Sequence, residues 1–285
     1  MSHRFDKVVV VGAGLIGASL AGAGRSRGLF GWVTAVGRSR ANLDRAVGAG
    51  LVDEGTRELE PALADADLII IATPVDSALD LLNRVVAVSP KTALISDVGS
   101  VKGPICTRAS DLGIESRFVG SHPMAGGVAS GAAWADTSLF EGRVVALTPA
   151  GSSKTALAKL SALWQGVGAV VVEMPPGVHD SAVAFASHLP QFTAYALAAT
   201  AEAKRGDAMV ARLAGAGMRD TTRLAASNAD MWLAVAALNK REIVAALEAM
   251  SSALDQVKAA VDSGDRAALA AIIERARRFA AGNEA

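Results

Sequence analysis

The sequence predicts an α/β domain followed by an all-α domain, and two patterns carry this prediction. Short apolar runs alternate with helical stretches as far as residue 175, whereas only alanine-rich helical patterns follow from residue 176. Strands that are apolar throughout and alternate with helices are typical of a parallel sheet covered on both faces. A length of 285 residues also fits two domains of roughly 150 residues each. We therefore divide the chain into residues 1–175 and residues 176–285.

The first domain is expected to contain seven strands. Each of the first five apolar runs is followed by glycine, proline or a small polar residue and then by a helical stretch, as βα units are. A helix is predicted over residues 154–167, because Leu157, Leu160 and Trp164 fall on one face of it. The predicted strands cover residues 7–11, 32–36, 68–73, 92–96, 117–120, 143–148 and 169–174.

The helical half presents two long apolar surfaces. Residues 181–201 contain no charged side chain, and apolar residues recur every three or four positions over residues 242–261. That spacing is typical of a seam in a helix bundle or coiled coil. Because about 110 residues cannot easily bury both surfaces alone, we expect a homodimer formed through this half. The seam residues are Ile243, Leu247, Met250, Leu254, Val257 and Val261.

Composition excludes several classes of protein. Lys and Arg total 28, as do Asp and Glu, so the chain lacks the basic excess that a nucleic-acid binder needs. The single cysteine, Cys106, forbids an internal disulfide and a cysteine-based zinc site, which indicates the cytoplasm. No cluster of His, Asp and Glu has metal-ligand spacing, so no metal is expected. Residues 181–201 could span a bilayer by length, but His188, Pro190 and Gln191 would be costly in lipid, so no membrane segment is expected.

A glycine-rich turn directly follows the first predicted strand. Residues 12–17 read GAGLIG and open a helical stretch, which is the arrangement of a Rossmann-type dinucleotide-binding fold. Glycines there allow a tight turn and the close approach of a pyrophosphate to the amides of the helix N-terminus. A glycine-rich turn without a ligand is the alternative. The residues expected to contact the cofactor are Gly12, Gly14, Leu15, Ile16 and Gly17.

The end of the second strand bears on the choice of cofactor. An NAD-specific protein usually carries Asp or Glu about 20 residues after the last glycine, where it binds the ribose 2′-hydroxyl. This chain has Arg38 and Ser39 there, followed by Arg40. These side chains can donate hydrogen bonds to a 2′-phosphate, which favours NADP and leaves NAD possible. A solvated basic loop without a phosphate is the alternative.

Four later segments resemble one enzyme family. They read DVGSVK at residues 97–102, SHPMAG at 121–126, SHLP at 187–190 and GMRDTTR at 217–223. In this order behind GAGLIG, they resemble the prephenate/arogenate (cyclohexadienyl) dehydrogenase family of tyrosine biosynthesis over about residues 7–265. The resemblance implies oxidative decarboxylation of a small cyclohexadiene substrate, with a hydride passing to the nicotinamide and a proton passing to a base.

The resemblance also implies roles for individual residues. His122 corresponds to the base that takes the substrate's hydroxyl proton, for which a neutral imidazole is well suited. Ser100 corresponds to a serine that bonds to this histidine and to the same hydroxyl. Arg223 corresponds to the arginine that binds the substrate carboxylate. Further residues implied near the substrate or the cofactor are Arg219, His188, Gln191, Trp232, Thr73 and Pro74.

Some of these residues admit purely structural roles. His188 could form a buried hydrogen bond across the domain interface. The neighbouring pair His179 and Asp180 is predicted to cap a helix or to join the two domains, and Arg219 could bond only to Asp220.

Two departures from the family pattern concern the substrate side chain. Some prephenate-preferring members carry a second histidine where this chain has Gln191, and an acidic residue where it has Gly127 and Val128. A neutral amide can accept a hydrogen bond from the ammonium of arogenate and still tolerate a keto group. We therefore expect arogenate to be used at least as well as prephenate. Strict use of prephenate is the alternative, with Arg219 supplying the missing cation.

Two other interpretations remain. A β-hydroxyacid or 6-phosphogluconate-type dehydrogenase also joins a Rossmann domain to a helical one. It would need a catalytic lysine in a matching motif, and Lys204, Lys240 and Lys258 lie in none. A non-catalytic NADP-sensing module would bind a protein through its helical half, and would leave His122 and Ser100 unexplained.

Overall fold

One sheet of eight strands organises the first half of the chain. The computed structural model describes residues 4–126, 131–204 and 208–282. The strand order β3-β2-β1-β4-β5-β6-β7-β8 contains the 3-2-1-4-5-6 order of a Rossmann-type domain, which confirms the predicted fold class. The strands are β1 (Phe5–Val11), β2 (Phe30–Val36), β3 (Glu54–Thr56), β4 (Leu68–Ile71), β5 (Leu94–Asp97), β6 (Phe118–Pro123), β7 (Val144–Thr148) and β8 (Val170–Glu173).

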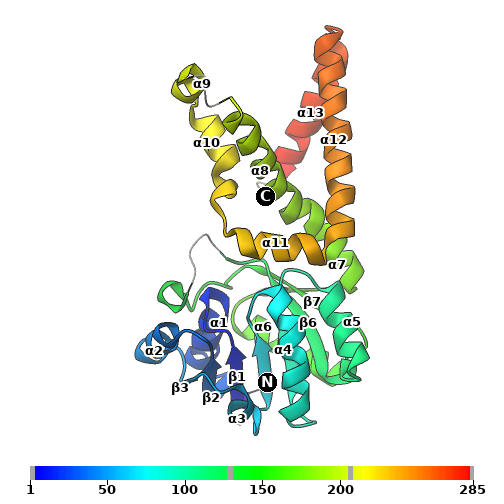
Figure 1. The fold of residues 1–285 in the computed structure, drawn as a ribbon. Helices are drawn as coiled ribbons and strands as arrows, with labels where there is room; N and C mark the ends of the chain where they lie inside the picture. Colours follow the sequence, from blue (N-terminus) through cyan, green and yellow to red (C-terminus); the bar gives the residue numbers. More distant parts are fainter. Residues whose placement is uncertain (1–3, 127–130, 205–207, 283–285) are drawn as a thin grey trace.

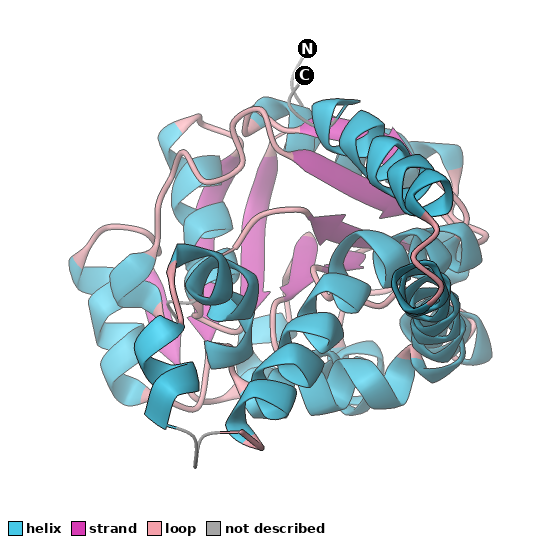
Figure 2. Ribbon diagram, turned by 90° about the horizontal axis from the view of Figure 1, so that it is seen from above, coloured by secondary structure: helices cyan, strands magenta, loops and turns pink. Residues whose placement is uncertain are grey.

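Apolar side chains alternate between the two faces of this sheet, and helices cover both faces (Figure 2). In β1, Val8 and Val10 share a hydrophobic cluster with α1 and α6, whereas Val9 and Val11 share another with α3, α4 and α5. Because successive side chains of a strand point to opposite faces, an unbroken run of valines is buried on both sides. The helices of this half are α1 (Leu15–Ser26), α2 (Arg40–Gly48), α3 (Leu59–Leu63), α4 (Val75–Val88), α5 (Gly103–Asp111) and α6 (Lys154–Gly166).

All seven predicted strands are present, but the sheet differs from the prediction in two respects. The short strand β3 was not expected, because its three residues are only partly buried and include Gly55. The sheet is also not parallel throughout, since β7 runs antiparallel to β6. Parallel neighbours need a crossover, usually a helix. Between β6 and β7 the described residues contain only the 3-10 turn η2 (Ala132–Trp134), so the chain returns in the opposite direction.

Helices follow the sheet from residue 176 onward. The uncharged stretch of residues 181–201 is not one regular helix, because a π-helical turn, η3, divides it. In a regular α-helix the carbonyl of Ala186 would clash with the ring of Pro190, four residues later. The wider π-helical turn relieves this clash. These elements are α7 (Pro176–Val183), η3 (Ala184–His188), α8 (Leu189–Glu202), α9 (Ala208–Leu213), α10 (Ala216–Thr222), η4 (Arg223–Ala226), α11 (Ala229–Leu238), α12 (Lys240–Asp262) and α13 (Arg266–Gly282).

The helical half extends away from the sheet as two diverging arms (Figure 1). One arm contains α8, α9 and α10, the other contains α12 and α13, and α11 crosses between them beside the sheet domain. The arms expose large apolar side chains, including Leu213, Leu254, Val261 and Phe279. Within the described ranges, no helix combines the length and apolar character that crossing a bilayer requires.

Candidate active site

The chemistry-bearing residues gather where the parallel strands end. The glycine turn follows β1, Thr73 follows β4, Ser100 and Lys102 follow β5, and His122 lies in β6. The carboxyl edge of an open α/β sheet is where such folds bind ligands. This edge faces the helical half in Figure 1.

The glycine turn leaves room for a phosphate at the N-terminus of α1. Gly12 has φ +117°, and a Cβ there would lie 2.4 Å from the carbonyl oxygen of Ala72. A Cβ on Gly17 would lie 2.1 Å from the carbonyl oxygen of Gly12, so both positions require glycine. At Gly14, by contrast, no described atom lies within 4 Å of an added Cβ. The space beside the N-cap of α1 is therefore open, which fits a dinucleotide pyrophosphate.

The loop after β2 leaves one of its two arginines unpaired. Arg40 forms an ion pair with Asp44 on the same helix, at 3.0 Å. The Ser39 hydroxyl caps α2 by accepting a hydrogen bond from the backbone amide of Asn42, at 3.3 Å. Arg38 is exposed and forms no ion pair with any residue that the structure describes. Its guanidinium is therefore available to a ligand.

The buried hydroxyl of Thr73 has no hydrogen-bond partner among the described residues. Thr73 lies just after β4, beside the glycine turn, and Pro74 is the N-cap of α4. A buried hydroxyl normally has a partner, so this one is available to a bound molecule.

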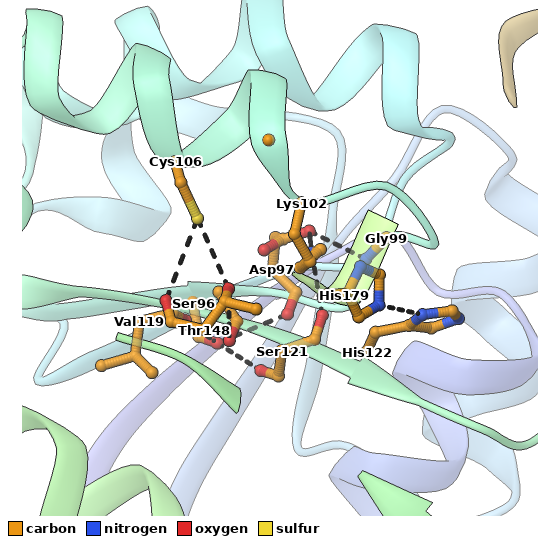
Figure 3. A network of polar contacts seen from close by, with 12 residues as sticks. Ser96, Asp97, Gly99, Lys102, Cys106, Val119, Ser121, His122, Thr148 and His179 are labelled. Carbon is orange, nitrogen blue, oxygen red and sulfur yellow. Dashed lines mark hydrogen bonds and ion pairs between the residues drawn. The ribbon is translucent and has the colours of Figure 1, made fainter. Parts of the chain in front are cut away.

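Three side chains form a hydrogen-bonded row at the end of β6. Nδ1 of His122 lies 2.8 Å from Nε2 of His179, and Nδ1 of His179 lies 2.7 Å from Oδ1 of Asp180. Figure 3 shows the two imidazoles meeting edge to face between β6 and α7. Nε2 of His122 has no hydrogen-bond partner in the described part of the chain.

Asp180 joins the helical half to the start of α5. Its Oδ1 also accepts a hydrogen bond from the backbone amide of Lys102, and its Oδ2 accepts one from Gly103, each at 2.7 Å. A Cβ on Gly103 would lie 2.8 Å from Oδ2, so glycine permits this close approach. Burial by itself raises the pKa of the Asp180 carboxyl, but the hydrogen bonds from His179 and the two amides outweigh it, and the pKa is lowered.

Lys102 fixes the loop after β5 against β6. Its ammonium, fully buried, forms an ion pair with Asp97 and donates a hydrogen bond to the carbonyl oxygen of Ser121, at 2.9 Å. Asp97 Oδ2 also accepts a hydrogen bond from the amide of Gly99, at 2.8 Å. These contacts, drawn in Figure 3, hold Gly99 and Lys102, between which Ser100 lies in the chain, and Ser121, the residue preceding His122.

The surroundings of His122 keep its imidazole neutral. Burial lowers its pKa well below the ordinary value of 6.5, and the nearby groups His179, Lys102 and His188 lower it further. A neutral imidazole with a free nitrogen is a competent base at neutral pH.

His188 and Trp232 present two unsatisfied nitrogens to one region. His188 Nδ1 lies 3.2 Å from Nδ2 of Asn239. The Asn239 Nδ2 also donates a hydrogen bond to the carbonyl oxygen of Asp180, at 2.9 Å. Burial lowers the pKa of His188 to about 4, so this imidazole is neutral. Its Nε2 and Nε1 of Trp232 are buried without partners in the described structure, and the two rings meet edge to face at 5.8 Å.

Gln191 connects α8 to the turn that carries Arg223. The Gln191 side chain is buried, its Nε2 donates to the carbonyl oxygen of Leu224 at 2.7 Å, and its Oε1 accepts from Ser227 at 3.4 Å. Arg223 and Arg219 are exposed and form no ion pair with another described residue. The possible bond between Arg219 and Asp220 is thus not formed, and both arginines are free.

The site differs from the implied arrangement at two places. No hydrogen bond joins Ser100 to His122 in the described structure; the partner of His122 is His179 instead. The sequence assigned His179 and Asp180 to capping or to the domain interface. Neither side chain caps α7, the helix that contains both residues, but Asp180 joins the two halves by accepting hydrogen bonds from the first amides of α5. Gly127 and Val128 lie outside the described residues. No three described His, Cys, Asp or Glu residues are grouped so as to hold a metal ion.

Comparison with known proteins identifies relatives along nearly the whole chain. Residues 20–173 match the family described as prephenate dehydrogenase, nucleotide-binding domain, and residues 175–275 match prephenate dehydrogenase, dimerization domain. A prephenate dehydrogenase of Bacillus subtilis is 32% identical over 270 residues, covering 93% of this chain and 72% of that protein. A cyclohexadienyl dehydrogenase of Zymomonas mobilis is 29% identical, covering 92% of this chain and 90% of its own length.

Solved structures agree with these matches. The prephenate dehydrogenase of A. aeolicus, in complex with hydroxyphenyl propionate and NAD+, superposes with a TM-score of 0.93 at 28% identity, over 99% of each chain. An arogenate dehydrogenase of Synechocystis gives a TM-score of 0.84 at 32% identity, over 97% of this chain and 99% of the other. A 3-hydroxyisobutyrate dehydrogenase of Mycobacterium tuberculosis, at 12% identity and a TM-score of 0.52, shares the fold alone. The chain belongs to the prephenate dehydrogenase family.

Proposed function

We propose that this chain catalyses the oxidative decarboxylation of arogenate, prephenate or both in tyrosine biosynthesis. The observation that carries the proposal is a neutral, half-buried His122 with a free Nε2, at the same sheet edge as the dinucleotide turn. A sensing module would have no use for a base in that position. Neither would a β-hydroxyacid dehydrogenase, whose chemistry uses a lysine on the helical domain.

His122 supplies the proton transfer of this reaction. Its Nε2 takes the proton of the ring hydroxyl while the hydrogen on the same carbon leaves as hydride. A bound nicotinamide supplies the hydride acceptor. The ring carboxylate then leaves as carbon dioxide, and its bonding electrons complete the aromatic ring. The glycine turn, the N-terminus of α1 and the free hydroxyl of Thr73 would hold the cofactor.

The substrate's negative charges would meet donors from the helical half. Arg223 and Arg219 are unpaired within the described structure and can bind carboxylates bidentately. His188 and Trp232 add two buried N–H groups that lack acceptors. Ser100 lies in the loop between Gly99 and Lys102, close in the chain to both fixed points, and we propose that it orients the substrate hydroxyl.

We propose that arogenate is used at least as well as prephenate. Gln191 carries no charge, and its Oε1 has only a long contact with Ser227, so that oxygen can still accept a hydrogen bond from an ammonium. Strict use of prephenate stays the alternative, because the free Arg219 could bind the keto acid.

NADP is the proposed cofactor, in preference to NAD. Arg38 is exposed and unpaired within the described ranges at the end of β2, where NAD-specific folds carry a carboxylate. The Ser39 hydroxyl can donate to a phosphate while it caps α2. Arg40 contributes less than its charge suggests, since Asp44 neutralises it.

We further propose a cytoplasmic homodimer of two-domain subunits, divided at residues 175 and 176. The two arms of the helical half expose apolar side chains that a second copy would cover. The free, buried Cys106 fits a reducing compartment.

One experiment tests the reaction, the substrate and the cofactor together. The purified protein is supplied with arogenate or prephenate and with NADP+ or NAD+, and kcat/KM is measured from absorbance at 340 nm for all four combinations. The highest value is expected with arogenate and NADP+. No reduction of either cofactor with either substrate would refute the proposed activity.

A further inference from the structure

The row Asp180, His179 and His122 determines where hydrogens lie on the two imidazoles. Asp180 accepts backbone hydrogen bonds on both oxygens, and its lowered pKa keeps it ionised, so it can only accept. The hydrogen in the 2.7 Å contact between Asp180 and His179 must therefore lie on Nδ1 of His179.

The position of the hydrogen on His179 also determines which atom donates in the contact between His179 and His122. In its neutral form His179 carries a hydrogen on one nitrogen only, so with that hydrogen on Nδ1 its Nε2 has a lone pair. This lone pair lies 2.8 Å from Nδ1 of His122, a distance that two facing lone pairs would not keep. Nδ1 of His122 must therefore donate, and its Nε2 must carry the free lone pair.

We propose that His179 is a positioning residue that sets the tautomer of His122, and that Asp180 in turn sets the tautomer of His179. The inference rests on the proposed function of His122 as the base. Without His179, an imidazole in this place could carry its hydrogen on Nε2, and it could not then accept a proton from the substrate.

The same row supports His122 after the proton transfer. The imidazolium keeps its Nδ1 hydrogen bond to His179, and Asp180 offsets the new positive charge through that ring. The other charged or titratable groups around His122 are Lys102 from the loop after β5, Asp97 at the end of β5, and His188 from η3. Lys102 opposes a cation at His122, and Asp97 is paired with Lys102. Asp180 is therefore the anion that is connected to His122 through hydrogen bonds, and it favours the proton transfer.

The row also depends on how the two halves of the molecule pack. His122 lies in β6, whereas His179 and Asp180 lie in α7, the first helix of the helical half. Asp180 is held in turn by the amides that open α5. The correct tautomer of His122 therefore requires α7 to be packed against the sheet domain.

Nitrogen NMR tests the tautomer directly and without turnover. The chain has four histidines, so protein labelled with ¹⁵N only in histidine gives few signals, and His122→Asn identifies those of His122. In the unmodified protein near pH 8 we expect the hydrogen of His122 on Nδ1. In His179→Phe, which removes the acceptor, we expect a mixture of tautomers or a shift to Nε2. In His179→Gln, whose amide oxygen can occupy the position of Nε2, we expect the hydrogen to return to Nδ1.

Kinetics of the same variants give the second measurement. We expect His179→Phe to lower kcat by roughly 10- to 10²-fold with cofactor KM within about threefold, and His179→Gln to recover most of the loss. Asp111→Asn, an exposed change on α5, is the control for general effects and should match the unmodified protein.

The outcomes separate this proposal from the proposed function. A hydrogen on Nε2 of His122 in the unmodified protein would overturn the proposal even if His179→Phe failed to fold. So would a His179→Phe variant that keeps the Nδ1 tautomer and a normal kcat. If NMR shows the predicted tautomers but the protein is inactive with both substrates, the proposed reaction is refuted and the assignment of the hydrogens still holds.

Discussion

At the residue scale, burial decides the charge of His122 and therefore the pH range of activity. Only the neutral imidazole can act as a base, and burial lowers its pKa well below 6.5. Because activity is lost as pH falls through this pKa, kcat/KM should stay constant down to pH 6.5 and decline only below it. A decline centred above 6.5 would contradict this assignment.

Removal of the base should strongly lower turnover and leave cofactor binding nearly unchanged. We expect His122→Asn to lower kcat by roughly 10²–10⁴-fold, because the side chain keeps a polar group but loses the proton acceptor. The dissociation constant for the cofactor, measured by fluorescence titration, should stay within about threefold. A variant with near-normal turnover would exclude His122 as the base.

Arg38 offers a second test at this scale. Loss of an arginine–phosphate contact costs about 1.5–3 kcal/mol, so Arg38→Ala should raise the KM for NADP+ by roughly 10- to 100-fold. The KM for NAD+ should hardly change, since NAD+ has no 2′-phosphate. Arg45→Ala, on the following helix, is the matched control. An unchanged KM for NADP+ would remove the basis for the cofactor proposal.

Single residues could be predicted only where their motif is local. His122 and the glycines stand in short motifs whose neighbours in the chain define their surroundings. The partner of His122 is 57 residues away, and nothing near His179 in the sequence indicates that it meets β6 rather than capping a helix. The hydrogen bond from Gln191 to the carbonyl of Leu224 also joins residues 33 positions apart, so the sequence could not predict it either.

At the element scale, Lys102 holds the loop after β5 to the end of β5 through its ion pair with Asp97, and to β6 through its hydrogen bond to Ser121. Lys102→Met keeps the volume but leaves Asp97 buried and unpaired, so we expect the free energy of unfolding to fall by about 3–5 kcal/mol. Adding Asp97→Asn should recover part of the loss. Urea unfolding at one fixed protein concentration measures both, with exposed Lys91→Met as the control. An unchanged midpoint for Lys102→Met would mean that the pair does not stabilise the fold.

Helices and strands could be predicted where their burial requires a recognisable pattern of apolar residues. Residues 8–11 of β1 and the whole of β4 are buried on both faces, so these stretches are apolar throughout. The direction of β7 has no such signature, because an antiparallel strand buried on both faces has the same composition as a parallel one. The strand β3 is short and half-exposed, so neither length nor apolar character distinguishes it from a loop.

At the scale of the whole molecule, the exposed apolar side chains of the two arms are those expected of one subunit of a homodimer. The seam predicted along α12 is buried near its start, at Ile243, and becomes exposed toward its end, at Leu254 and Val261. The exposed part lies along the arm that points away from the sheet domain (Figure 1). A monomer would leave this surface in water, whereas a second copy could cover it with the same surface, as a twofold interface requires.

Light scattering should therefore give about twice the subunit mass of 28.9 kDa at micromolar concentration. Leu254→Glu places two charges in a twofold interface and removes two buried leucines, each contributing about 1.5–3 kcal/mol, so the dimer dissociation constant should rise roughly 10²-fold or more. Val88→Glu, at the end of α4 and away from the arms, adds the same charge and should stay dimeric. If the unmodified protein has the mass of one subunit, the arms are not the dimer interface. If both variants dissociate equally, the effect is one of net charge, and the seam of α12 does not hold the two copies together.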